Sequence, residues 1–244
     1  MKKFFSSLIF FSLLIVFIGS GLLLFHNVED EHHYHHMEEQ IEEEKQILIE
    51  EDFELEELVE NNEINEDTIG WITIAGTSID YPIVQAGANC YYLTQDCNGD
   101  ESKYGSIFMD CRNAMDFSDK HTILYGHNMK NGSMFHDLNE YDSHVYLDEH
   151  TYIEVYSQGV NRKWAIFSTY STEPDFNYLQ TEFASSEEYS SFLNSLLSHS
   201  EFDDLKVQVT AEDKILTLST CSDDLEHGRR VVHAKLVEEV IDEK

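Results

Sequence analysis

Hydrophobic residues follow several distinct patterns along this chain of 244 residues. Residues 4–25 are almost wholly apolar and uncharged, and Lys2 and Lys3 precede them. These twenty-two residues, at about 1.5 Å rise each, form a helix of roughly 33 Å, which matches a bilayer core. A cleaved signal peptide has a shorter apolar region and a small-residue cleavage site, whereas no alanine precedes Ala75 here. The pattern predicts a single-pass anchor in the cell membrane, with residues 1–3 cytoplasmic and the remainder extracellular.

Residues 26–67 are rich in acidic side chains and contain a single lysine, Lys45. Ile41, Leu48 and Leu55 fall seven residues apart, which predicts an amphipathic helix over about 38–60. This segment is expected to be a solvated juxtamembrane spacer that contains an N-terminal helix.

From Gly70 onward the chain changes to short β-like runs separated by turns. Runs this short and frequent indicate a closed or nearly closed β-barrel with added helices, formed by a domain over 68–244. Short helices are expected near 88–95 and 133–140. We expect strands at 71–75, 78–84, 105–110, 121–125, 151–156, 163–170, 205–210, 214–220 and 229–237.

One longer helix is predicted between the strands at 163–170 and 205–210. Ser185 precedes Glu188 by three residues, which is typical of a capping box at a helix N-terminus. One apolar stripe follows on the same helix face, formed by Tyr189, Phe192, Leu193, Leu196 and Leu197.

Charge and cysteine usage limit the possible functions. A formal net charge of -33 argues against nucleic-acid binding, because phosphate would be repelled. Cys221 is the only cysteine in the C-terminal half, and it ends a β-like run. If Cys221 is a free thiol, at most one disulfide can form among Cys90, Cys97 and Cys111, and their spacing does not choose the pair.

The stretch from Ile215 to Leu236 combines a thiol with a guanidinium. Arg229 and Arg230 open the β-like run that follows Cys221, so one of them can face the thiol across a strand pair. Successive strand residues point to opposite faces, which allows only one of the two to do so. His127 ends an earlier run, 122–125, after Gly126. The facing thiol and guanidinium suit a thiolate nucleophile with a fixed positive donor nearby.

The residues 217–221, TLSTC, resemble the active-site motif of sortases, the membrane-anchored transpeptidases that attach proteins to the cell wall of Gram-positive bacteria. The order of histidine, cysteine and arginine agrees with that family. Segments 79–85, 105–110, 122–129 and 229–236 resemble class B sortases, as does the long helix between late strands. Cys111 departs from the class, whose members generally have an aromatic residue there. The resemblance covers about residues 55–240 and implies a sortase-type eight-stranded β-barrel.

This resemblance assigns roles to individual residues. Cys221 would attack the carbonyl of a threonine in a sorting peptide, and His127, rather than His121 or His136, would transfer protons. Arg229, five positions before Ala234, would stabilise the oxyanion or substrate carbonyls. The resemblance also implies that Thr220, with Ser219, borders the substrate. Asp223 is a possible orienting acid, although a solvated loop acid is the simpler interpretation.

The same resemblance implies the partners. Substrates would be secreted proteins with a C-terminal sorting motif of the Asn/Ser-Pro-x-Thr-Asn/Gly kind, and the acceptor would be an amine of a lipid-linked peptidoglycan precursor. The enzyme would need no cofactor and no metal.

Two alternatives remain open. A cysteine peptidase that releases its acyl group to water would use the same thiol and imidazole. The cluster His32–His36 (HHYHH) with its acidic surroundings also permits a membrane-tethered metal-binding protein.

Overall fold

The computed structural model describes residues 34–35, 38–39, 41–42, 65–221 and 228–241, and the chain divides into two compact units, Met1–Gln46 and Ile47–Lys244. In the first unit the described residues are helical. The predicted helix over 38–60 agrees with the described residues 38–39 and 41–42, and its remainder lies outside the described residues.

No helix within the described ranges is both long enough and apolar enough to cross a membrane. A crossing helix needs about 20 mostly apolar residues. This finding contradicts the prediction of a single-pass membrane protein, and we do not retain that localisation. The proposed span itself, residues 4–25, lies outside the described residues.

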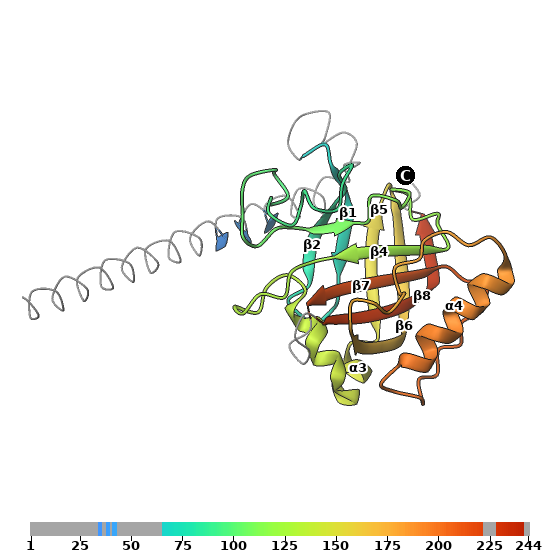
Figure 1. Ribbon diagram of the computed structural model, residues 1–244. Coiled ribbons are helices and arrows are strands. Elements are labelled where there is room, and N and C mark those ends of the chain that lie inside the picture. The colour runs from blue at the N-terminus through green and yellow to red at the C-terminus, as the bar shows by residue number, and fades with distance from the viewer. Residues whose placement is uncertain (1–33, 36–37, 40, 43–64, 222–227, 242–244) are drawn as a thin grey trace, which may run out of the picture. The chain divides into compact units, whose positions relative to one another are not determined.

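The second unit is built on a closed eight-stranded β-barrel, as predicted (Figure 1). Around the barrel the strand order is β1-β2-β3-β4-β7-β8-β6-β5. The pairs β2–β3 and β4–β7 are parallel, and the other pairs are antiparallel. The strands are β1 (Thr68–Thr73), β2 (Asp80–Val84), β3 (Ile107–Met109), β4 (His121–Tyr125), β5 (Tyr152–Ser157), β6 (Val160–Thr172), β7 (Ile215–Cys221) and β8 (Arg229–Ile241).

Two predicted elements are wrong. Residues 205–210 alternate in exposure as a strand would, but they belong to no strand, because a closed barrel leaves no free edge to pair with. Val207 and Val209 instead pack against the cluster beneath α4. Residues 88–95 form successive turns rather than a helix. The helix expected at 133–140 is found as the 3-10 helix η1 (His136–Asp142), which is followed by α3 (His144–Glu149).

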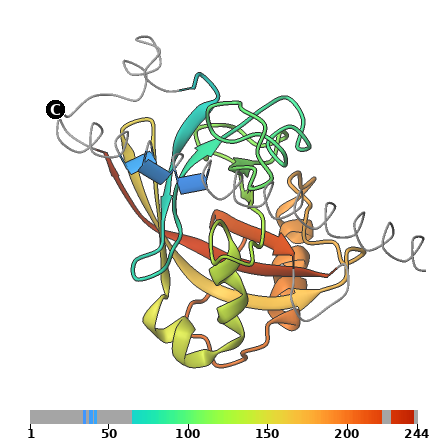
Figure 2. The same cartoon turned by 90° about the vertical axis from the view of Figure 1, so that its left-hand side faces the viewer.

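The long helix α4 (Ser186–His199) forms where predicted and covers one outer face of the barrel (Figures 1 and 2). Ser185 caps it by accepting a hydrogen bond from the Glu188 N–H at 3.2 Å. The Glu188 carboxylate bonds to the N–H of Ala184, so the reciprocal half of the capping box is displaced by one residue.

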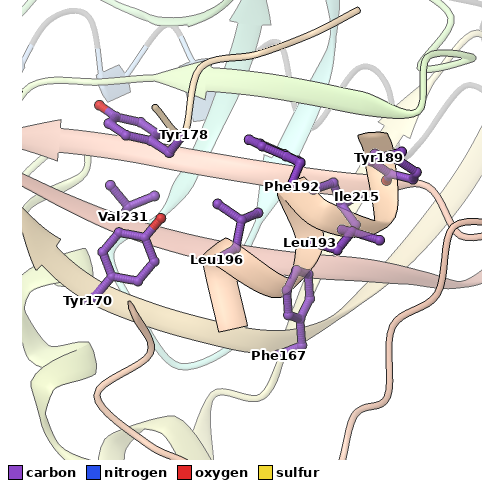
Figure 3. Close-up of a cluster of buried hydrophobic side chains, with 9 residues drawn as sticks. All are labelled: Phe167, Tyr170, Tyr178, Tyr189, Phe192, Leu193, Leu196, Ile215 and Val231. Carbon is purple, nitrogen blue, oxygen red and sulfur yellow. The ribbon is translucent and has the colours of Figure 1, made fainter. Parts of the chain in front are cut away.

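A buried hydrophobic cluster fixes α4 to the sheet (Figure 3). Burying each large side chain contributes about 1.5–3 kcal/mol relative to leaving it exposed. Of the predicted stripe, only Leu197 remains exposed, at 38%. The cluster comprises Phe167, Tyr170, Tyr178, Tyr189, Phe192, Leu193, Leu196, Ile215 and Val231.

Candidate active site

The register of two parallel strands brings His127 and Cys221 to the same end of the sheet. Tyr125 of β4 pairs with Ser219 of β7, and the Gly126 N–H donates to the Ser219 carbonyl at 3.3 Å. His127 and Cys221 each lie two residues beyond this pair, and both strands point the same way (Figure 1). Adjacent strands are about 4.8 Å apart. The backbone of Cys221 is described as the last residue of β7, whereas its side chain lies outside the described part of the chain.

The ring of His127 is half-buried and is held by one backbone group. Its Nε2 lies 2.7 Å from the carbonyl oxygen of Leu93. A carbonyl can only accept, so Nε2 bears the hydrogen, and in the neutral ring Nδ1 is the basic nitrogen. The backbone carbonyl of His127 accepts from the Phe135 N–H at 2.9 Å. The imidazole is therefore oriented by the backbone of Leu93. Nothing in the sequence signalled this role of Leu93.

The other two histidines weighed in the sequence have different contacts. His121 is fully buried, and burial lowers its pKa to about 4. His136 lies 2.7 Å through Nδ1 from the side-chain oxygen of Asn128.

Arg229 and Arg230 have different environments, as strand alternation requires. Arg229 pairs with Cys221 across the antiparallel β7–β8 ladder, and directly opposed residues point to the same face. Its guanidinium is half-buried, and Nη1 donates to the Gly228 carbonyl at 3.0 Å. Arg230 pairs with Thr220 and is 0% exposed.

The side chain of Arg230 is fully enclosed rather than exposed on the surface of the strand. Its Nη1 contacts both carboxylate oxygens of Glu201, at 2.7 and 2.9 Å, and its Nε donates to the Leu138 carbonyl at 3.3 Å. Leu138 belongs to η1, so the arginine is enclosed where η1 packs against β8. Arg230 is therefore a structural ion-pair partner, and its neighbour Arg229 is the guanidinium on the face of Cys221.

Ser219 and Thr220 also point to opposite faces. Ser219 lies on the face of Cys221, and its Oγ is 3.0 Å from the hydroxyl of Tyr178. Thr220 is 2% exposed, and its Oγ1 has no hydrogen-bond partner among the described residues. Asp223 lies outside the described residues.

A buried carboxylate, Asp110, ties together the segments around His127. It accepts hydrogen bonds from the hydroxyl of Tyr125 at 2.8 Å and from Asn89 Nδ2 at 3.0 Å. Burial alone would raise the pKa of Asp110, but hydrogen bonds from Arg112 outweigh it and lower the pKa to about 2. Arg112 also donates to the Leu179 carbonyl at 3.1 Å. Asp110 and Arg112 are only two residues apart, but no sequence pattern identified the cluster around them, because Asn89, Tyr125 and Leu179 come from distant segments.

A second buried network connects β4, β7, β8 and β6 beneath α4. His121 Nε2 lies 2.6 Å from Thr217 Oγ1, which lies 2.7 Å from His233 Nδ1; His233 Nε2 lies 2.8 Å from the hydroxyl of Tyr170. At the other end, His121 Nδ1 lies 2.7 Å from the Gln180 carbonyl, which can only accept. Burial lowers the pKa of both rings, so both are neutral near pH 7, and each link then donates toward Gln180.

In the described part of the chain, no three His, Cys, Asp or Glu side chains gather to hold a metal ion. Of the cluster 32–36, which left metal binding open as an alternative, only Tyr34 and His35 are described, and His35 Nδ1 lies 3.2 Å from a Glu38 carboxylate oxygen.

Comparison with known proteins agrees with this geometry. The family model described as the sortase domain matches residues 72–237. Sortase B of Listeria monocytogenes is 42% identical over 184 residues, which cover 75% of this chain and 74% of that protein. Sortase B of Staphylococcus aureus is 37% identical over 176 residues, covering 71% and 72%. The solved S. aureus sortase B–substrate complex superposes with a TM-score of 0.75 at 32% identity, covering 83% of this chain and 97% of that one.

Proposed function

Since this chain belongs to the sortase family, in its class B, and the members of that family are cysteine transpeptidases, we propose that it cleaves sorting peptides after threonine and transfers the acyl group to an amine. We propose residues 68–244 as its catalytic domain. The observation that supports this most directly is the register of β4, β7 and β8: Cys221 ends β7, Arg229 begins β8, and His127 lies two residues beyond the end of β4.

The proposed reaction begins at the sulfur of Cys221. Its thiolate attacks the threonine carbonyl carbon, and a tetrahedral intermediate with a negative oxygen forms. Collapse of this intermediate breaks the peptide bond and leaves a thioacyl-enzyme. The leaving amine takes a proton from His127 as imidazolium, and the neutral ring then accepts a proton from the incoming amine as that amine attacks the thioester.

Arg229 is proposed to stabilise the charge that develops on the substrate oxygen. A guanidinium is always protonated and presents several donors in a fixed plane, which suits an oxyanion or a row of peptide carbonyls. Its position opposite Cys221 on the same strand face supports this role. Loss of one such donor typically lowers kcat by about 10²–10³.

Ser219 is proposed to border the bound peptide together with Tyr178, because both lie on the face of Cys221. Thr220 points to the opposite face and is proposed to shape the site through packing beneath it. Asp223 is proposed only as a possible orienting acid.

The proposed substrates are secreted proteins with a sorting motif of the Asn/Ser-Pro-x-Thr-Asn/Gly kind. The S. aureus relative has been solved as a substrate complex, which supports a peptide ligand for this fold. We propose an amine of the lipid-linked peptidoglycan precursor as the acceptor.

Incubation of the protein with a fluorescently quenched sorting peptide, in the presence and in the absence of an amine such as triglycine, tests the proposal. Transpeptidation predicts a product that contains the amine, whereas release of the free acid alone would favour the peptidase alternative. Mass spectrometry should detect an acyl adduct on Cys221, and Cys221→Ala should abolish both adduct and product.

Matched variants separate chemistry from folding. His127→Ala should remove activity, while His144→Ala, at a half-exposed ring outside the proposed site, should leave it unchanged. Arg229→Ala should lower kcat by about 10²–10³, and Arg229→Lys should restore only part of it because the planar donor pair is lost. Full activity of Arg229→Ala would contradict the proposed role.

A further inference from the structure

Three cysteines lie outside the proposed chemistry, and the fold distinguishes among them. Cys90 and Cys111 are exposed, whereas Cys97 is buried at 5% exposure. The backbone carbonyl of Cys97 also accepts a hydrogen bond from Asn65 Nδ2 at 2.7 Å. Only Cys90 and Cys111 are therefore accessible to a reagent from solvent.

The side chain of Asn89 joins the segments that contain these two exposed cysteines. The N–H of Cys111 donates to Asn89 Oδ1 at 2.7 Å, and Asn89 Nδ2 donates to the Asp110 carboxylate at 3.0 Å. Asn89 immediately precedes Cys90, which is the third residue of a turn closed by the Tyr91 N–H and the Ala88 carbonyl at 3.2 Å.

A second contact holds the same two segments together. Gln85 is buried, and its Nε2 donates to the backbone carbonyls of Asp110 and Asn113, both at 2.8 Å. Consecutive Cα atoms are about 3.8 Å apart, and a disulfide requires Cα atoms about 4.4–6.8 Å apart. Cys90 adjoins Asn89, whose side chain contacts the Cys111 nitrogen, so the segments that contain the two cysteines lie side by side.

From these contacts we propose that Cys90 and Cys111 are a disulfide-forming pair that fastens the segment 86–105 beside the candidate active site. A thiolate of one cysteine attacks an external disulfide, such as glutathione disulfide or that of an oxidoreductase, and forms a mixed disulfide with release of one thiolate. The second cysteine then attacks the mixed disulfide, and the second external thiolate leaves. Two protons go to solvent, and two electrons pass to the external disulfide.

The bridge would act on the residue that orients His127. Leu93, whose carbonyl contacts His127 Nε2, follows Cys90 by three residues. Cys111 follows Asp110, which bonds the hydroxyl of Tyr125 on β4. Closing the loop between the two cysteines therefore limits movement of the Leu93 carbonyl away from the imidazole. The bridge itself does not depend on the proposed transpeptidation.

Peptide mapping of the full chain tests the pair. The protein is equilibrated with glutathione disulfide, the free thiols are alkylated, and the chain is digested without reductant. We expect a linked peptide pair containing Cys90 and Cys111 in the wild type and in Cys97→Ser. The link should be absent in Cys90→Ser and in Cys111→Ser. Separate alkylation or separate glutathionylation of Cys90 and Cys111, or a link from either to Cys97, would overturn the proposal.

Thermal unfolding provides a second readout. A disulfide that closes a loop of about twenty residues stabilises the folded domain. Reduction should therefore lower the Tm of the wild type by roughly 5–10 °C. The Tm of Cys90→Ser should not respond to the same reductant. An equal response of both proteins would refute the bridge, because the shift would then come from another thiol.

Discussion

Removal of the carboxylate of Glu201 should destabilise the domain more than removal of the guanidinium that it binds. Arg230 is 0% exposed, whereas the Glu201 side chain is 35% exposed. In Glu201→Ala, a buried cation keeps only two neutral oxygen partners, those of Leu138 and Ser171, both at 3.3 Å. Breaking a buried pair in this way costs about 3–5 kcal/mol.

The reverse change leaves a carboxylate that can turn toward water. In Arg230→Met, methionine fills much of the buried volume, and the cost should be about 1–2 kcal/mol from lost hydrogen bonds. Solvent exposure of the surviving partner therefore decides the order of the two variants.

Urea unfolding followed by tryptophan fluorescence measures both costs. With an m-value of about 2 kcal/mol/M, the midpoint should fall by roughly 1.5–2.5 M in Glu201→Ala and by less than about 1 M in Arg230→Met. Arg230→Met should also retain amine transfer, since its guanidinium faces away from Cys221. A larger loss of stability in Arg230→Met than in Glu201→Ala would refute the reasoning.

Three further predictions concern pH and the strand end before His127. Acid should destabilise the domain as pH falls from 6.5 toward 4, because burial lowers the pKa of His121 to about 4, so that the unfolded state takes up the proton first. The urea midpoint should show that the free energy of unfolding falls by about 1.4 kcal/mol per pH unit. A constant midpoint between pH 6.5 and 5 would contradict this. Gly126→Ala should lower both Tm and activity because a Cβ there would clash with Phe135, whereas Gly87→Ala, with nothing within 4 Å, should change neither. Asp110→Asn should lower the Tm at pH 7. It should also remove the loss of stability between pH 3.8 and about 2, since this carboxyl, with its low pKa, stabilises the fold only while it is ionised. If calorimetry across that range showed the same pH dependence of the Tm in Asp110→Asn and in the wild type, the ion pair would be unimportant.

The local pattern of the sequence was sufficient for most of the barrel. Eight of the nine expected strands are present, with β4 found at the predicted residues 121–125, since alternating or continuous apolar runs report burial directly. The capping residue Ser185 and the stripe from Tyr189 to Leu196 located α4 for the same reason. The TLSTC motif and the order of His127, Cys221 and Arg229 along the chain also indicated the candidate chemistry, since residue type and spacing are enough to recognise both.

Other features depend on contacts between segments far apart in the chain. Residues 205–210 have the alternation of a strand, but the closed barrel offers them no partner, and pairing is a property of the whole sheet. Strand alternation predicted that Arg229 and Arg230 point to opposite faces. The burial of Arg230 could not be predicted, because it depends on contacts with η1 and Glu201. The contact of His127 with the Leu93 carbonyl, made across thirty-four positions, likewise required the tertiary fold. Local residues determine where strands form and which faces they bury, while register and enclosure decide which side chains meet, because both arise only when distant segments pack together.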